Sequence, residues 1–381
     1  MSDAALGLYV HLPWCVRKCP YCDFNSHART QAPDENAYVA ALIRDLEREC
    51  AAIEAPRFTS VFFGGGTPSL FASESIAAIL DAVRQRDRLV PEAEITLEAN
   101  PGASDQARFA GYRAAGVNRL SIGVQSLDDA ALQRLGRIHD ARAARDAVRA
   151  ARAAGFENLN IDLMYALPDQ DAASALADLD RALALDPDHL SYYQLTIEPD
   201  TAFAARPPAN LPVDDAIAEI EHAATEMLAA AGYARYEVSA WTRPGHQCRH
   251  NLTYWRFGDY VGIGAGAHGK LTDPASGQVE RHAKQKAPVR YMATAGTAAA
   301  DAERRFVDAD ELPFEFMLNA LRLDEGFTLE RWEARTALPA SVLDTRLDAA
   351  RDRGLIESEG GIWRPTALGR RFLNDLVGSF A

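Results

Sequence analysis

Short apolar runs alternate with amphipathic helical stretches over the first half of the chain. Six of these runs are rich in branched residues and lack clean polar alternation, which predicts buried parallel strands. They cover residues 6–12, 60–66, 94–100, 119–126, 158–167 and 189–196. Helical patterns occupy residues 35–50, 74–86, 140–155 and 171–186, and several of them end at Gly or Pro, as helices commonly do.

This alternation predicts an α/β fold, a partial (β/α)6 barrel similar to an incomplete TIM barrel, with functional groups at the carboxyl ends of its strands. A closed eight-unit barrel and a doubly wound sheet are the alternatives. Residues 310–381 predict helices, a hairpin that turns at Gly360 and Gly361, and a final helix, which together resemble a small winged-helix-like domain. We therefore expect a core domain at 1–240, a connecting segment at 241–305 and a C-terminal domain at 306–381.

Length and charge narrow the function classes. A chain of 381 residues, 48% of them hydrophobic, predicts more than one folded unit with a substantial core. No run of about 18 apolar residues is present, so we expect no transmembrane helix. The first residues do not resemble a signal peptide, so we expect a cytoplasmic protein. The net charge of −14 argues against a nucleic-acid groove and favours a lid or docking role for the winged-helix-like region.

Three of the five cysteines, Cys15, Cys19 and Cys22, lie within eight residues near the start of the chain. Cysteines in a long cytosolic chain favour metal binding or catalysis over disulfides. Three thiolates can hold three irons of a four-iron cluster and leave the fourth iron open, whereas a ferredoxin-type cluster and a closed zinc site each need four ligands. A zinc site completed by His11 or His27 is the alternative.

The spacing CxxxCxxC, with Tyr21 just before the last cysteine, resembles the signature of radical S-adenosylmethionine (SAM) enzymes. In that superfamily the cofactor completes the open iron of a [4Fe-4S] cluster, and the pair generates a 5′-deoxyadenosyl radical, which side chains cannot supply. The run GGGTPS at residues 64–69 is similar to the superfamily's GGE-type motif. This similarity implies that Gly65, Gly66 and Thr67 hold the methionyl amine of the cofactor. The resemblance also makes Tyr21 an expected cofactor-binding residue.

Polar residues stand at or near the ends of the later predicted strands. Buried charges are costly there unless they are paired or bound to a ligand. Glu98, Gln125, Arg137 and Asp162, in this order, resemble the cofactor-contacting residues of the oxygen-independent coproporphyrinogen III oxidase family. The resemblance covers almost the whole chain. It implies a radical SAM barrel in which Glu98 contacts the amino-acid part of SAM and Tyr9 packs near the cofactor.

Two features separate the branches of this family. Its coproporphyrinogen dehydrogenases carry a further cysteine two positions after the cluster motif, where this chain has Phe24. The run HNLTYW at residues 250–255 resembles the motif of the heme chaperone (HemW) branch, which implies that His250 ligates heme iron beside aromatic surface. An ordinary hydrogen-bonded histidine is the alternative. The rival heme ligands are Cys248, His246 and His268.

These resemblances imply a heme-binding protein that carries a [4Fe-4S] cluster and S-adenosyl-L-methionine and hands heme to acceptor hemoproteins such as respiratory-chain proteins. No catalytic residue is assigned. An oxygen-independent coproporphyrinogen III dehydrogenase, which decarboxylates propionates by radical chemistry, is the alternative. A winged-helix regulator that senses redox state through the cluster is a third reading, which the charge balance disfavours. A homodimer and peripheral association with a membrane are left open.

Overall fold

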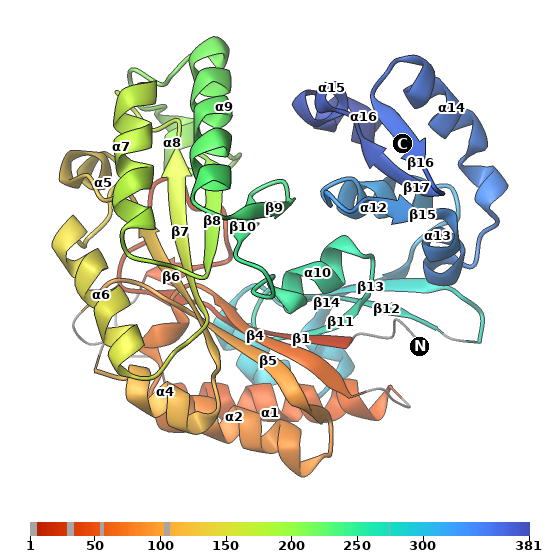
Figure 1. The fold of residues 1–381 in the computed structure, drawn as a ribbon. Coiled ribbons are helices and arrows are strands. Elements are labelled where there is room, and N and C mark those ends of the chain that lie inside the picture. Colours follow the sequence, from red (N-terminus) through yellow and green to blue (C-terminus); the bar gives the residue numbers. More distant parts are fainter. Residues whose placement is uncertain (1–5, 29–33, 54–56, 103–106, 274) are drawn as a thin grey trace.

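A curved twelve-stranded sheet organises the molecule (Figure 1). The computed structural model describes residues 6–28, 34–53, 57–102, 107–273 and 275–381. Neighbouring strands at the centre of the sheet run parallel, in the order Asp259–Ile263 (β11), Leu6–Leu12 (β1), Phe58–Gly65 (β4), Leu89–Ala99 (β5), Arg119–Gln125 (β6), Leu159–Tyr165 (β7) and His189–Gln194 (β8). Antiparallel strands extend both edges, Ala240–Thr242 (β10) and Ala234–Glu237 (β9) beyond β8, and His268–Thr272 (β12), Val279–Lys284 (β13) and Asp301–Phe306 (β14) beyond β11.

The partial barrel expected from the sequence is confirmed, because the six predicted strands form β1 and β4 to β8. β9 and β14 stand at the two edges of the sheet, and no pairing joins them within the described residues. The apolar pattern missed β11, which pairs in parallel with β1 and belongs to the expected connecting segment 241–305. The three expected domain boundaries stay a prediction.

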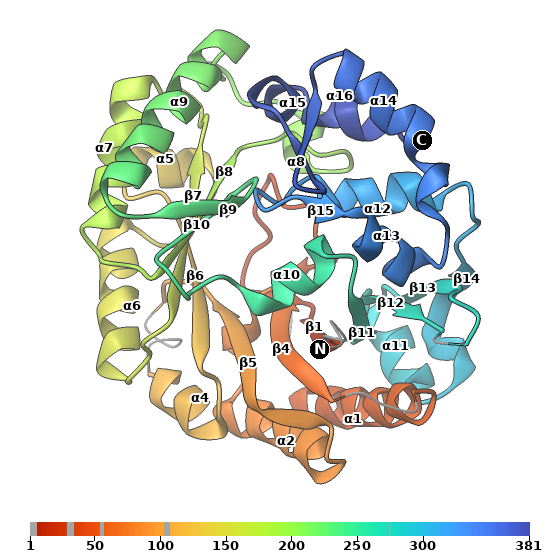
Figure 2. The same cartoon turned by 45° about the vertical axis from the view of Figure 1, so that its right-hand side comes forward.

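Helices cover the convex face of this sheet (Figures 1 and 2). They are Glu35–Ala51 (α1), Ser73–Gln85 (α2), Phe109–Ala115 (α4), Asp129–Arg134 (α5), Ala141–Ala153 (α6), Ala172–Leu183 (α7), Asp214–Ala230 (α9) and Pro288–Thr294 (α11). The short helix Ala202–Ala205 (α8) instead lies beside the cysteine loop, where the Phe203 amide donates to the Pro20 carbonyl at 2.9 Å. The side chains of Asp140 and Asp171 accept from the third amide of α6 and α7, which fixes where each helix begins. Apolar residues such as Leu42, Ile79 and Leu179 lie fully buried in one cluster with the strands, so burial of this helix face holds the layers together.

One helix lies on the other side of the sheet. Arg249–Trp255 (α10) crosses the opening of the curve in Figure 2 and packs against β1, β4 and β11. Gly7 of β1 lies beneath it, where a Cβ would stand 3.2 Å from the His250 ring. The helix that carries the HNLTYW run therefore covers the interior of the partial barrel near the beginnings of these strands.

The C-terminal region forms the helices and hairpin that the sequence predicts. Its elements are Leu312–Ala320 (α12), Phe327–Thr328 (β15), Leu329–Thr336 (α13), Asp344–Asp352 (α14), Ile356–Glu359 (β16), Ile362–Pro365 (β17), Ala367–Arg371 (α15) and Leu373–Gly378 (α16). Gly360 and Gly361 turn the hairpin with φ of 59° and 83°, a conformation that favours glycine. A separate core forms around Phe316 and Trp332. None of the helices in the described ranges combines the length and the apolar character that a membrane span requires.

Candidate functional site

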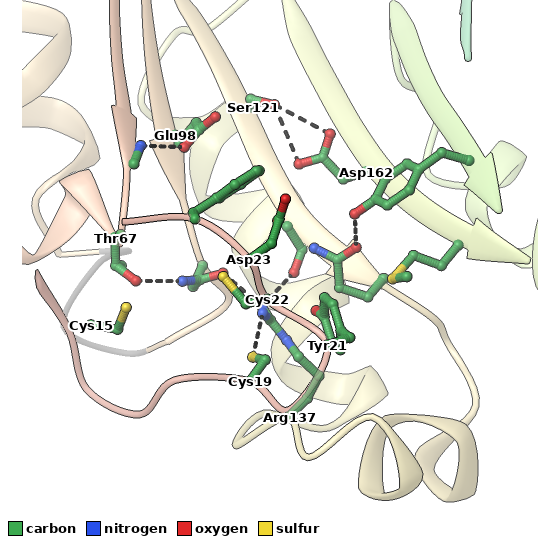
Figure 3. Close-up of a pocket in the computed structure, with 18 of the residues that line it drawn as sticks. Cys15, Cys19, Tyr21, Cys22, Asp23, Thr67, Glu98, Ser121, Arg137 and Asp162 are labelled. Atoms are coloured by element: carbon green, nitrogen blue, oxygen red, sulfur yellow. Dashed lines mark hydrogen bonds between the residues drawn. The ribbon is translucent and has the colours of Figure 1, made fainter. Parts of the chain in front are cut away.

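A cavity of about 400 Å³ opens at the carboxyl ends of the parallel strands (Figure 3). Parallel strands end at the same edge of a sheet, so residues far apart in sequence meet there. The predicted site residues that line it are Cys15, Cys19, Tyr21, Cys22, Gly65, Gly66, Thr67, Glu98, Gln125, Arg137 and Asp162. Tyr9 and His250 are not among the lining residues.

The three cysteines lie on the loop that follows β1. Trp14–Cys15 (β2) pairs in parallel with His27–Ala28 (β3), and the loop between them carries Cys19 and Cys22 to the cavity wall. Arg137 donates to the Cys19 sulfur at 3.4 Å (Figure 3). Within the described residues, no three His, Cys, Asp or Glu side chains converge on one metal-ion position. A four-iron cluster binds each thiolate through a different iron and so does not need the three sulfurs to meet at one point.

The glycine run packs against the base of the cysteine loop. A Cβ at Gly66 would lie 2.6 Å from the Trp14 carbonyl oxygen, and one at Gly65 would lie 2.6 Å from the His11 ring. Gly65 also adopts a φ of +116°, which side chains rarely allow. The Thr67 amide donates to the same Trp14 oxygen at 2.8 Å. The glycine run therefore lets the end of β4 approach the cysteine loop more closely than any residue with a Cβ would allow.

Two carboxyl groups face the cavity from the strands on either side of β6, Glu98 on β5 and Asp162 on β7. Burial, followed by the nearby charge of Asp162, raises the pKa of Glu98 to about 8 despite the hydrogen bond that it accepts from the Gly65 amide at 3.2 Å. Burial also raises the pKa of Asp162, although Asn160 donates to its carboxylate at 2.7 Å. Among the residues that the structure describes, neither carboxylate forms an ion pair, and a bound cation would supply a partner.

Arg137 and Gln125 are fixed by residues that the sequence analysis did not identify. Arg137 donates to Asn100 at 2.6 Å and to the Gly123 carbonyl at 2.9 Å. Gln125 ends β6 with a φ of 67° and accepts from the Tyr193 hydroxyl at 2.7 Å. Asn100, Gly123 and Tyr193 all line the cavity. Asn100 was open to detection, because it ends the same predicted strand as Glu98.

Tyr9 and His250 lie in the interior of the sheet rather than at the cavity wall. The Tyr9 hydroxyl is bonded to His11 Nδ1 at 3.0 Å, and its ring lies 6.3 Å from that of Phe62 and 6.5 Å from that of His250. Burial, followed by the charge of Glu98, raises the pKa of Tyr9 well above its usual value. Tyr9 therefore lies between the cavity and α10.

His250 is 1% exposed, and both of its ring nitrogens have partners. Nδ1 lies 2.9 Å from the Ser60 hydroxyl and Nε2 lies 2.7 Å from the Tyr254 hydroxyl. Burial, followed by the charge of Arg119, lowers the pKa of His250 to about 3, so the ring is neutral at physiological pH. Here His250 is a hydrogen-bonded core histidine, and its prediction as heme ligand stays a prediction that requires one of these bonds to break.

The rival heme ligands differ in exposure. Cys248 is fully buried, and burial raises the pKa of its thiol to about 12. His246 is partly exposed and His268 is exposed. Of the four candidates, His268 is therefore the most accessible to a large planar ligand.

Exposed apolar side chains occur at one lining residue of the cavity and next in sequence to two others. Val16 is 55% exposed, Phe24 58% and Ile138 63%. Phe24 lines the cavity, and Val16 and Ile138 each adjoin lining residues. Exposed apolar groups that cluster beside a cavity commonly mark a binding surface.

Comparison with known proteins identifies the family. Residues 9–182 match the Radical SAM superfamily, and residues 307–372 match the HemN C-terminal domain. The chain is 46% identical over 375 residues to the heme chaperone HemW of Escherichia coli (strain K12), with 98% of each chain covered. The chain belongs to the HemW family of radical SAM proteins.

A second HemW relative, from Haemophilus influenzae (strain ATCC 51907 / DSM 11121 / KW20 / Rd), is 45% identical over 379 residues, covering 98% of this chain and 97% of that one. The solved structure of coproporphyrinogen III oxidase (HemN) from Escherichia coli matches with a TM-score of 0.82 at 23% identity, covering 99% of this chain and 90% of the other. That likeness confirms the fold alone. Membership of the HemW family thus confirms the resemblance that the cysteine motif and the strand-end residues suggested.

The radical SAM superfamily implies a four-iron cluster and SAM, and the residues at the cavity fit both. Three thiols from one loop match the three protein ligands of an open cluster. Glu98 and Asp162 suit a cofactor with cationic and hydroxyl groups, and the glycines of β4 allow a ligand to approach the backbone.

Proposed function

We propose that this protein is a cytoplasmic heme chaperone, which binds heme and passes it to acceptor hemoproteins such as respiratory-chain proteins. The observation that carries the proposal is identity of 46% along nearly the whole chain to a protein named as a heme chaperone. Phe24 supports the proposal, because the coproporphyrinogen dehydrogenases of the family that this chain resembles have cysteine at that position. The exposed apolar side chains at and next to the cavity lining support it as well, since a tetrapyrrole is a flat apolar ligand.

In this proposal Cys15, Cys19 and Cys22 hold the four-iron cluster. Gly65, Gly66 and Thr67 receive the amino group of SAM, with Glu98 as its charged partner. The remaining proposed contacts are Tyr9, Tyr21, Gln125, Arg137 and Asp162. When bound, the pair would supply one-electron cleavage of a sulfonium bond. The protein's own residues position the cofactor, exclude water through the buried strand ends and neutralise its charge.

One anaerobic experiment separates the chaperone from the dehydrogenase. Reconstituted protein receives heme in one arm, and coproporphyrinogen III with SAM and a reductant in the other. We expect stable heme absorption bands and no decarboxylated porphyrinogen. Decarboxylated product would establish the enzyme instead, and absence of heme binding would contradict the chaperone.

The heme ligand is tested with His250→Ala, and His222→Ala serves as the matched control because His222 is exposed on α9. If His250 ligates iron, the heme bands of His250→Ala shift while its iron and sulfide content stays that of wild type. Unchanged bands in His250→Ala would move the assignment to His268, His246 or Cys248.

A further inference from the structure

Buried polar side chains fill the interior of the sheet between the cavity and α10. Barrel interiors of this kind are usually packed with branched apolar residues. Here the parallel strands bury a different set: Ser60, Glu94, Thr96, Arg119, Ser121, Asn160 and His189. Buried polar groups are costly unless they are bonded to one another, so their arrangement calls for a reason.

Four hydrogen bonds lead from the cavity to the start of α10. Asn160 Nδ2 donates to the Asp162 carboxylate at 2.7 Å, and Asn160 Oδ1 lies 2.6 Å from His189 Nδ1. His189 Nε2 lies 2.8 Å from the Tyr236 hydroxyl. The Tyr236 oxygen accepts from the backbone amide of Cys248 at 3.2 Å, and Cys248 is the residue that precedes α10. The chain is continuous, and each of its links is buried or partly buried.

The partners fix the direction of these bonds. An amide oxygen only accepts, so His189 carries its proton on Nδ1 and presents a bare Nε2 to the Tyr236 hydroxyl. Burial, followed by the charge of Arg119, holds the pKa of His189 well below its usual value, which keeps the ring neutral. The Tyr236 oxygen is then free to accept from Cys248. Every donor therefore points toward Asp162, and bonds aligned in this way polarise one another.

The start of α10 is held by the same buried group of residues. The Glu94 carboxylate accepts from the amides of Arg249 and His250, each at 3.0 Å, and lies 3.5 Å from the Cys248 sulfur. A shift of the Cys248 amide relative to Tyr236 would therefore move the first residues of the helix together, with the His250 backbone among them.

We infer that Tyr236 is a positioning residue, which couples occupancy of the cavity at Asp162 to the placement of α10. A ligand that donates to Asp162 competes with Asn160 for the carboxylate, and the change passes through His189 and Tyr236 to Cys248. The inference rests on the proposed function, because it takes SAM as the ligand at Asp162. Coupling of this kind is reciprocal, so the position of α10 also alters the affinity for SAM.

The test compares Tyr236→Phe with Tyr233→Phe. Tyr236→Phe removes only the hydroxyl that links His189 to Cys248, whereas the Tyr233 hydroxyl donates to the Pro187 carbonyl outside the chain of bonds. In the reconstituted full-length protein, we expect Tyr236→Phe to raise the Kd for SAM about 3- to 10-fold, the loss of roughly one net hydrogen bond. Tyr233→Phe should leave the Kd as in wild type.

Amide hydrogen exchange measures the coupling itself, which a purely structural role of Tyr236 would leave unchanged. In wild type, SAM should slow amide exchange in residues 248–255, and in Tyr236→Phe this response should disappear while SAM is still bound. Equal SAM affinity in Tyr236→Phe and wild type, or a wild-type segment that ignores SAM, would overturn the inference. A wild-type segment that ignores SAM overturns the inference even if Tyr236→Phe fails to fold. Wild type that binds no SAM would contradict the proposed function instead.

Discussion

The raised pKa of Glu98 predicts that Glu98→Gln stabilises the protein in the absence of SAM. Glu98 takes up its proton near pH 8 in the folded chain instead of near 4.5. Below the pKa of Glu98 in the unfolded chain, the carboxyl is protonated in both states and its full contribution to stability is present. As the pH rises through its pKa in the folded chain, that contribution is lost, because ionisation is easier in the unfolded chain. Glutamine keeps an oxygen for the Gly65 amide and removes the ionisation, so the variant escapes that loss.

The size of the effect follows from the two pKa values. At about 1.4 kcal/mol for each unit, the full difference at pH 8 would be on the order of 4 kcal/mol. Glu98 lines an open cavity, where water reduces the penalty, so we expect Glu98→Gln to raise the free energy of unfolding by about 1–2 kcal/mol at pH 8. At pH 5 the two proteins should differ by less than about 0.5 kcal/mol.

Urea unfolding at pH 5, 6.5 and 8, followed by circular dichroism on preparations of equal iron content, measures this difference. Glu92→Gln is the control, because Glu92 is exposed on the same strand. The reasoning fails if Glu98→Gln is less stable than wild type at pH 8, or if its advantage is the same at every pH. The same variant should bind SAM at least about tenfold more weakly, since it loses a charged hydrogen-bond partner. Affinity of the wild type should rise from pH 6 to 8 as Glu98 ionises.

Three other substitutions test separate parts of the account. Cys19→Ser should lose most of the iron and sulfide that wild type retains after anaerobic reconstitution. Cys50, a buried free cysteine of α1 that does not line the cavity, is the control, and Cys50→Ser should keep both. A full cluster in Cys19→Ser would disprove the cysteine assignment. Gly65→Ala should lower the free energy of unfolding by more than about 2 kcal/mol, because its Cβ meets the His11 ring. Gly155 also has a positive φ, but a Cβ there would meet no other atom within 4 Å. Gly155→Ala therefore measures backbone strain without a steric clash, and it should lower the free energy of unfolding by about 1 kcal/mol. Glu94→Ala should cost about 2–4 kcal/mol in urea unfolding, since buried amides lose their acceptor; a loss below about 0.5 kcal/mol would show that Glu94 does not hold α10.

The sequence predicts the central strands because burial on both faces leaves a run of apolar and branched residues that no helix or surface strand would need. β11 escapes this reasoning. Of its five residues, DYVGI, only Val261 and Ile263 are buried apolar side chains. Gly258 and Gly264 lie on either side of the strand, so the local sequence pattern resembles a turn. Pairing with β1 makes it a strand, and that contact joins residues about 250 positions apart.

The candidate site is largely predictable for a related reason. Glu98, Gln125 and Asp162 stand near the carboxyl ends of predicted parallel strands, and the topology then brings those ends to one cavity. The environment of His250 is not predictable in this way. The HNLTYW run favoured a heme ligand over an ordinary hydrogen-bonded histidine, and the fold turns α10 inward and gives both ring nitrogens a hydroxyl partner. Only the tertiary arrangement decides that outcome.

Transfer of heme to an acceptor distinguishes a heme chaperone from a protein that merely binds heme. The reconstituted protein is loaded with heme, freed of excess heme, and mixed with an apo-hemoprotein whose absorption bands differ from those of the donor. If the protein is a heme chaperone, heme should move to the acceptor faster than it dissociates into a solution containing a passive heme scavenger. No coproporphyrinogen III should be consumed in a parallel assay. Heme that leaves at the same rate in both cases, or that never binds, would contradict the chaperone.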